Sequence, residues 1–182
     1  MITALAGLSV LAMLVWAIVL YNLLVRDRNR VAQSWSDVDV QLLRRHDLIP
    51  RLVEMVKGYA GYERAVLANV TELRAQSASA SPAARTEVEK TVNSGVTQLV
   101  ALAEAYPDLK ASENFRDLHQ KLVETESQIQ YARRYYNGAV NLYNNRVQQF
   151  PDVVIAHSFG FKEAEFFDLE EKAAAAAPVV NL

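Results

Sequence analysis

The side chains best suited to catalysis or metal binding are scattered along this chain. Its three histidines are His46, His119 and His157, and no two of them have the His-x-x-x-His spacing that places two metal ligands on one helix face. None follows a glutamate at the Glu-x-x-His spacing of carboxylate-bridged metal sites in helix bundles. The absence of cysteine excludes thiolate metal sites, cysteine nucleophiles and disulfides. We therefore expect no metal site and no cofactor.

Neighbouring carboxylates are the other candidates for acid–base chemistry. They occur as Asp37 with Asp39, Glu87 with Glu89, Glu124 with Glu126, and Glu170 with Glu171. Residues one or two positions apart point to different sides of a helix, so no pair forms an acid–base couple. We expect them on a solvated face with surface salt bridges. The chain also has no Gly-x-Ser-x-Gly elbow and no phosphate-binding glycine loop, and it is not expected to be an enzyme.

Basic residues gather at Arg44, Arg45 and His46, with Arg51 close behind. One interpretation is helix-end charge that offsets the helix dipole and pairs with Asp47. The other is a site for a phosphate or a lipid headgroup. Arg44 and Arg45 are accordingly candidates for interaction with a partner.

A membrane segment begins the chain. No charged side chain occurs from Ile2 to Val25, and a helix of that length measures about 36 Å, enough to cross the hydrocarbon core of a bilayer. A cleaved signal peptide would begin with basic residues and end at small ones, which this segment does not do. We expect residues 1–25 to be a retained membrane anchor.

Positive charge follows the apolar segment at Arg26, Arg28 and Arg30. Because positive flanks stay on the cytoplasmic side, we expect the N-terminus outside and residues 26–182 in the cytoplasm of a bacterial inner membrane. The same three arginines are candidates for contact with anionic headgroups at the membrane surface.

Five prolines divide the remaining chain into helical stretches, because proline disfavours helix interiors. The first helix is expected to continue from the membrane to about Leu48, and Pro50 to kink it or to open a second helix that ends near Ser77. A third helix begins at Pro82 after the capping residue Ser81 and ends at Tyr106. No convincing strand appears, so the fold class is all-α: one transmembrane helix that continues into an antiparallel bundle of about four long helices.

The fourth helix carries the strongest pattern. Its apolar stripe recurs every three or four residues, the packing period of bundles and coiled coils. The stripe consists of Phe115, Leu118, Leu122, Thr125, Ile129, Ala132, Tyr136, Val140, Tyr143, Val147 and Phe150. The bundle is expected to cover residues 26–150. Tyr131 and Tyr135 lie off the stripe, and we consider them candidates for a half-wet interface.

An aromatic tail over residues 151–172 follows the fourth helix, and we expect residues 173–182 to be a flexible terminus. The phenylalanines of the aromatic tail are Phe159, Phe161, Phe166 and Phe167. Aromatic side chains at this density favour burial. The tail either folds back to complete the core of the bundle, or forms a docking patch for a partner or a second subunit.

The longest motifs resemble the LemA family of bacterial membrane proteins. They include Arg28–Val31, Trp35–Pro50, Tyr106–Ala111, Phe150–Pro151 and Phe166–Phe167, and the resemblance covers essentially the whole chain. It implies one N-terminal membrane helix with a short outer terminus and a cytoplasmic helical bundle. It implies no established biochemical activity.

Three functions remain open at this stage. We favour a membrane-anchored scaffold or adaptor that acts through protein–protein contacts with membrane or cytoplasmic partners and through self-assembly as a homo-oligomer. The alternative is a lipid-binding or envelope-remodelling protein that works as an oligomer at the membrane surface. An unrecognised enzyme ranks last. The 19 basic and 21 acidic residues nearly balance, which argues against binding of nucleic acid.

The predicted topology can be tested by cysteine labelling, since the chain has no cysteine of its own. A cysteine introduced at Ala175 should react with a membrane-impermeant reagent only after the inner membrane is permeabilised. Labelling of this position from outside intact cells would overturn the predicted orientation.

Overall fold

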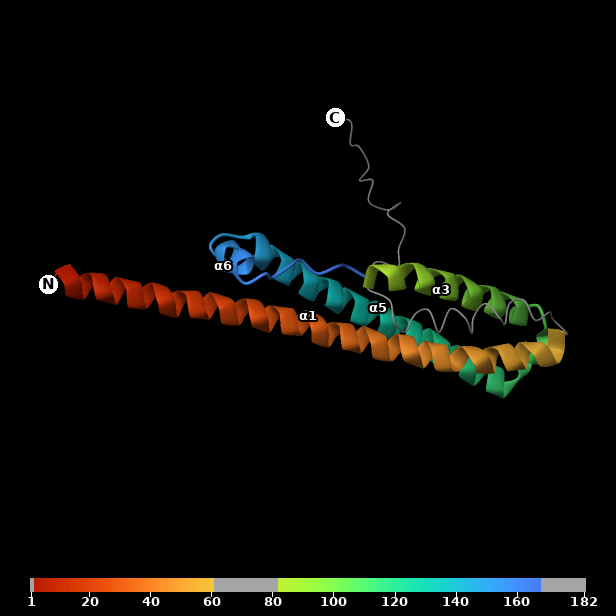
Figure 1. The fold of residues 1–182 in the computed structure, drawn as a ribbon. Helices are drawn as coiled ribbons and strands as arrows, with labels where there is room; N and C mark the ends of the chain where they lie inside the picture. The colour runs from red at the N-terminus through yellow and green to blue at the C-terminus, as the bar shows by residue number, and fades with distance from the viewer. Residues whose placement is uncertain (1, 61–81, 168–182) are drawn as a thin grey trace, which may run out of the picture. The chain divides into compact units, whose positions relative to one another are not determined.

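The structure, a computed structural model, describes residues 2–60 and 82–167. These residues form five helices and contain no strand, which confirms the predicted all-α class (Figure 1). The helices are α1 (Ile2–Ala60), α3 (Pro82–Glu104), α4 (Pro107–Ala111), α5 (Glu113–Gln148) and α6 (Asp152–Ser158). Ser81, the expected cap of the third helix, and residues 173–182 lie outside the described residues.

The chain forms two compact units that share the two longest helices. The first unit combines residues up to Gln41 with Ile129–Glu165, and the second combines Leu42–Gln128 with the residues from Phe166 onward. The N-terminal part of α1 therefore belongs to the first unit together with α6. The second unit contains α3, α4 and the first half of α5.

Helix α1 continues through Pro50, so the boundary predicted near Leu48 is wrong. A proline within a helix removes one backbone hydrogen bond and costs about 3 kcal/mol. Pro50 itself is exposed, whereas Ile49, Leu52 and Val53 beside it are buried. Burial of each such side chain contributes about 1.5–3 kcal/mol, which is enough to keep the helix intact across the proline.

The core of the second unit lies between α1, α3, α4 and α5. After the short turn that contains α4, helix α5 runs back antiparallel to α3 (Figure 1). Leu109 of α4 is buried and closes this end of the unit. The core residues are Ile49, Leu52, Val53, Val56, Val92, Leu99, Ala103, Leu109, Phe115, Leu118 and Leu122.

The first unit packs α5 and α6 against α1. Leu24 and Val38 of α1 are completely buried, and so are Val140 of α5 and Ala156 of α6. The predicted stripe of the fourth helix is buried through Val147, with Ala132 half-buried. Its last member, Phe150, is 82% exposed, because α5 ends at Gln148 before the stripe is complete.

The chain after α6 runs extended along α5. Asn144 binds Ala164 in both directions, through Nδ2 to the carbonyl oxygen at 2.9 Å and through Oδ1 from the amide nitrogen at 2.8 Å. The hydroxyl groups of Tyr143 and Tyr136 donate hydrogen bonds to the carbonyl oxygens of Lys162 and Glu165, at 2.9 and 2.7 Å. Side chains of α5 thus replace the strand partner that an extended segment would otherwise need.

Replacement of Asn144 by alanine should release this segment. The substitution removes two hydrogen bonds, so we expect Asn144→Ala to lower the free energy of unfolding by about 1–3 kcal/mol and to expose residues 162–165 to protease. Asn145→Ala, at an exposed neighbour that bonds only within α5, is the matched control and should change stability by less than about 0.5 kcal/mol. Thermal unfolding in detergent and limited proteolysis measure both effects; equal behaviour of the two variants would contradict this account.

Candidate functional site

The residues that we predicted from the sequence to contact partners differ in exposure. Five of them are exposed: Arg44, Tyr131, Tyr135, Phe159 and Phe166. Arg45, Phe161 and Phe167 are buried, which for the two phenylalanines agrees with the alternative that the tail folds back on the helices. The three arginines after the apolar segment, Arg26, Arg28 and Arg30, all remain exposed.

Arg45 is the centre of a buried ion cluster in the second unit. Its guanidinium forms an ion pair with Glu89 of α3 and a second, 3.0 Å long, with Glu126 of α5. His46 Nε2 lies 3.1 Å from the other oxygen of Glu89. The side chains of Arg45 and Glu89 are 2% and 0% exposed. This cluster ties three helices together through charges that would be costly to bury separately.

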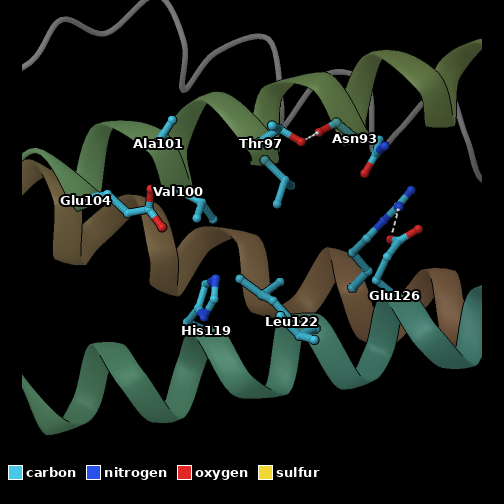
Figure 2. Close-up of a pocket in the computed structure, with 11 residues that line it drawn as sticks. Asn93, Thr97, Val100, Ala101, Glu104, His119, Leu122 and Glu126 are labelled. Atoms are coloured by element: carbon cyan, nitrogen blue, oxygen red, sulfur yellow. Dashed lines mark hydrogen bonds and ion pairs between the residues drawn. The ribbon is translucent and has the colours of Figure 1, made fainter. Parts of the chain in front are cut away.

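A groove of about 300 Å³ lies beside the cluster, between α3 and α5. Figure 2 shows Val100 and Leu122 on its apolar walls, with Glu126 at one end and Glu104 and His119 at the other. His119 is half-buried and its ring stacks on Phe115 with a 6.1 Å centroid distance. Such a groove has the size and character to hold a small, largely apolar molecule.

The groove brings Glu104 and His119 from different helices to one surface, which sequence spacing did not predict. Neither an ion pair nor a hydrogen bond joins these two side chains in the described part of the chain. Within residues 2–60 and 82–167, no group of three or more histidine, aspartate or glutamate side chains is placed to hold a metal ion.

A second ion cluster joins α1, α5 and α6 in the first unit. Arg146 Nε donates to Asp27 Oδ2 at 2.7 Å, and Nη1 donates to Asp152 Oδ1 at 3.0 Å. Burial lowers the pKa of Arg146, but the hydrogen bonds to Asp152 and Asp27 outweigh this effect and raise the pKa above its ordinary value. Arg26 adds a longer contact of 3.4 Å to Asp27.

The tyrosines of the α5 stripe are held protonated in the same unit. Burial, with a smaller contribution from the negative charge of Glu165, raises the pKa of Tyr136 to about 12. Burial also raises the pKa of Tyr143, an effect that nearby Arg28 opposes. Both phenols are therefore neutral hydrogen-bond donors at physiological pH.

Comparison with known proteins identifies the family to which this chain belongs. The profile of the LemA family matches residues 34–182. The chain belongs to the LemA family. The predicted resemblance is thus confirmed, and the matched range includes the Arg45 cluster, the groove and the C-terminal segment along α5.

Curated relatives of this LemA-family chain include magnetosome proteins. The chain is 24% identical to magnetosome protein MamQ 2 of Paramagnetospirillum magneticum, with 96% of this chain and 73% of the relative aligned. It is 22% identical to magnetosome protein MamQ of Magnetospirillum gryphiswaldense, over 98% of this chain and 75% of the relative. Protein LemA of Metamycoplasma hominis is 23% identical, over 82% of this chain and 69% of that protein.

Sequence reasoning missed both ion clusters of this LemA-family chain. Glu89 was expected on a solvated face, yet it is fully buried. Its partner Arg45 is 44 positions away, and Asp27 and Arg146 are 119 positions apart. A useful signal was present: Glu89 lies three residues before Val92 and four after Arg85, and all three are buried on one face of α3.

Removal of the charge on Glu89 should destabilise the second unit. Glu89→Gln leaves the buried guanidinium of Arg45 with only half-buried Glu126 as an acidic partner, so we expect a loss of about 3 kcal/mol in unfolding free energy. Glu87→Gln is the matched control on the same helix, because Glu87 pairs with Lys90 at the surface and should contribute less than about 1 kcal/mol. Denaturation followed by circular dichroism distinguishes the two variants, and an equal loss in both would refute a special role for Glu89.

Tyr136 should make stability depend on alkaline pH. The unfolded chain releases this phenol proton at a pKa of 10.0 and the folded chain at about 12, so stability is full below pH 10 and falls as the pH rises towards 12. Near-ultraviolet titration should show a late transition to which Tyr136 and Tyr143 both contribute, and Tyr136→Phe should reduce its amplitude. Tyr135→Phe, which removes an exposed phenol one position earlier, should leave that late transition in place.

Proposed function

We propose that this LemA-family protein is a membrane-anchored scaffold or adaptor of the bacterial inner membrane. The observation that carries the proposal is the exposure of the apolar start of α1. Among the described helices, α1 is the one apolar and long enough to cross a membrane. Its side chains from residue 3 to residue 19 are exposed apart from half-buried Ala17, including Leu8, Leu11 and Leu14. A bare apolar helix of this length matches a lipid environment better than water.

The anchor and the helical units share one continuous element. Because α1 continues without interruption from the apolar segment to Ala60, the bundle is attached to the anchor by a helix and not by a flexible linker. Confinement to a surface raises the effective concentration of binding sites, so weak contacts between copies or with partners gain avidity. The exposed arginines at the inner end favour an orientation with the N-terminus outside.

An exposed apolar stripe on α5 is our candidate for contact between proteins. Tyr131, Tyr135 and Leu142 lie within about 40° of one another around the helix, and each is about 60% exposed. Gly138 lies between them, and no atom lies within 4 Å of the position that a Cβ would take there. Aromatic residues on an open, small-residue surface are typical of interface cores.

Site-directed cross-linking tests self-assembly through this stripe. In native membranes, Tyr135→Cys and Leu142→Cys should form disulfide-linked dimers on mild oxidation, because symmetric copies would bring identical positions together. Asn141→Cys is the matched control: it is exposed and adjacent, but about 100° away around α5. Equal cross-linking at all three positions indicates random collision, and no cross-linking together with a monomeric mass in detergent would refute self-assembly.

A second candidate function is lipid binding or remodelling of the envelope by assembled copies. Arg26, Arg28 and Arg30 favour it, because all three are exposed directly after the apolar segment. In vesicles that contain anionic lipid, replacement of these arginines should reduce headgroup binding. The scaffold proposal does not require these arginines to bind headgroups.

A further inference from the structure

The turn after α6 holds two phenylalanines that differ in exposure. Gly160 has a φ of 71°, a left-handed conformation that glycine adopts without strain. The amide of Gly160 bonds the carbonyl of His157, and the amide of Phe161 bonds that of Ala156, which together make a Schellman C-cap. As a result Phe161 is buried against the unit, whereas Phe159 is 64% exposed.

The two rings mark a depth along the membrane helix. The ring of Tyr21 lies 4.9 Å from that of Phe159 and 5.7 Å from that of Phe161, both in edge-to-face arrangements. Tyr21 belongs to the uncharged segment, about 7.5 Å along the helix before Arg26. Phe159 therefore lies beside the uncharged segment of α1, close to the end where Arg26 follows it. Figure 1 shows α6 beside this N-terminal half of α1.

Burial along α1 gives the same depth independently. Leu20 and Leu24 are buried within the first unit, whereas residues 3–19 are mostly exposed. Residues 2–19 form about 27 Å of helix, close to the thickness of the hydrocarbon core at about 30 Å. The contact between α1 and the turn thus begins where the hydrocarbon ends.

The residues that connect α5 to the extended segment, 149–161, form what we call the α5–α6 tip. Three apolar side chains on it are exposed: Phe150 at 82%, Val154 at 54% and Phe159 at 64%. The acidic side chain of the tip, Asp152, is buried and paired with Arg146. The tip therefore presents apolar groups without an exposed carboxylate, and Arg28 lies 5.2 Å from the ring of Phe161 behind it.

We propose that the α5–α6 tip is a second membrane contact, inserted into the boundary between headgroups and acyl chains beside the anchor. The occupant of this surface is the lipid bilayer, because the tip is continuous with the apolar segment through Tyr21 and lies at its interfacial end. Aromatic side chains favour that boundary, and basic side chains beside them favour anionic headgroups. The inference rests on the proposed anchor and adds a second contact to it.

Single cysteines in the full-length chain test the depth of the tip. Val154→Cys and Phe159→Cys, each labelled with an environment-sensitive fluorophore, are reconstituted into vesicles with anionic lipid. We expect blue-shifted emission, quenching by lipids that carry a spin label near the headgroup, and protection from aqueous iodide. Val154→Cys keeps the Tyr21 and Phe159 rings in contact, so it remains informative if the other substitution disturbs the turn.

Two control positions make the outcomes distinguishable. A label at Asn141→Cys, exposed on α5 outside the tip and off the stripe of Tyr131, Tyr135 and Leu142, should be quenched by iodide and not by lipid. A label at Leu11→Cys reports the anchor and should be quenched by spin labels deep in the acyl chains. If Leu11 is quenched by lipid but positions 154 and 159 behave like 141, the tip proposal is wrong and the anchor stands. If Leu11 is not quenched by lipid, the anchor itself fails.

Protein contact at the tip gives a different result. Labels at 154 and 159 that are protected from both iodide and lipid quenchers would mean that a protein surface covers the tip, which also overturns the proposal. Circular dichroism of each labelled variant establishes that the helices remain folded.

Discussion

Helix α1 runs as one continuous helix from a candidate membrane span into the packed part of the protein. In hydrocarbon, each backbone polar group must be satisfied within the segment, so an apolar stretch such as residues 2–25 must be helical. In water, the same helix is stable only where a buried face packs against other elements. The change occurs over a few residues: Val19 is exposed, Leu20 is buried, and Asp27 is already part of an ion cluster. The positions of α5, α6 and the C-terminal segment in the first unit all follow from this change.

Charge within the two units serves packing more than chemistry. Arg45 with Glu89 and Arg146 with Asp27 each join helices that are distant in sequence, and each would be unfavourable if one partner were missing. Such pairs contribute less to stability than to the choice of one arrangement, because a helix that shifts along its neighbour loses its partner. The groove beside Arg45 is formed by the same three helices.

The sequence predicted the elements well because their signals are local. Hydrophobic periodicity placed α3 and α5 to within a few residues, and the uncharged run coincides with the helix that is a candidate membrane span. It misjudged Pro50, because a propensity cost of one residue is outweighed by burial of its neighbours. It also misjudged Arg45 and Glu89, whose burial depends on a contact 44 positions apart that no spacing rule reports. The sequence also could not predict which of Phe159 and Phe161 is buried, because this depends on the backbone conformation of the glycine between them.

The separation of Asp27 and Arg146 along the chain has a consequence for biosynthesis. The two residues are 119 positions apart, so Asp27 of α1 leaves the ribosome long before its partners on α5 and α6 are synthesised. Synthesis proceeds at about 5–20 residues per second. For several seconds, therefore, the α5 and α6 surface that covers Leu20, Leu24 and Asp27 has not yet been made. The face of α1 that carries Leu20, Leu24 and Asp27 can therefore be covered only after translation has reached α6, which ends at Ser158.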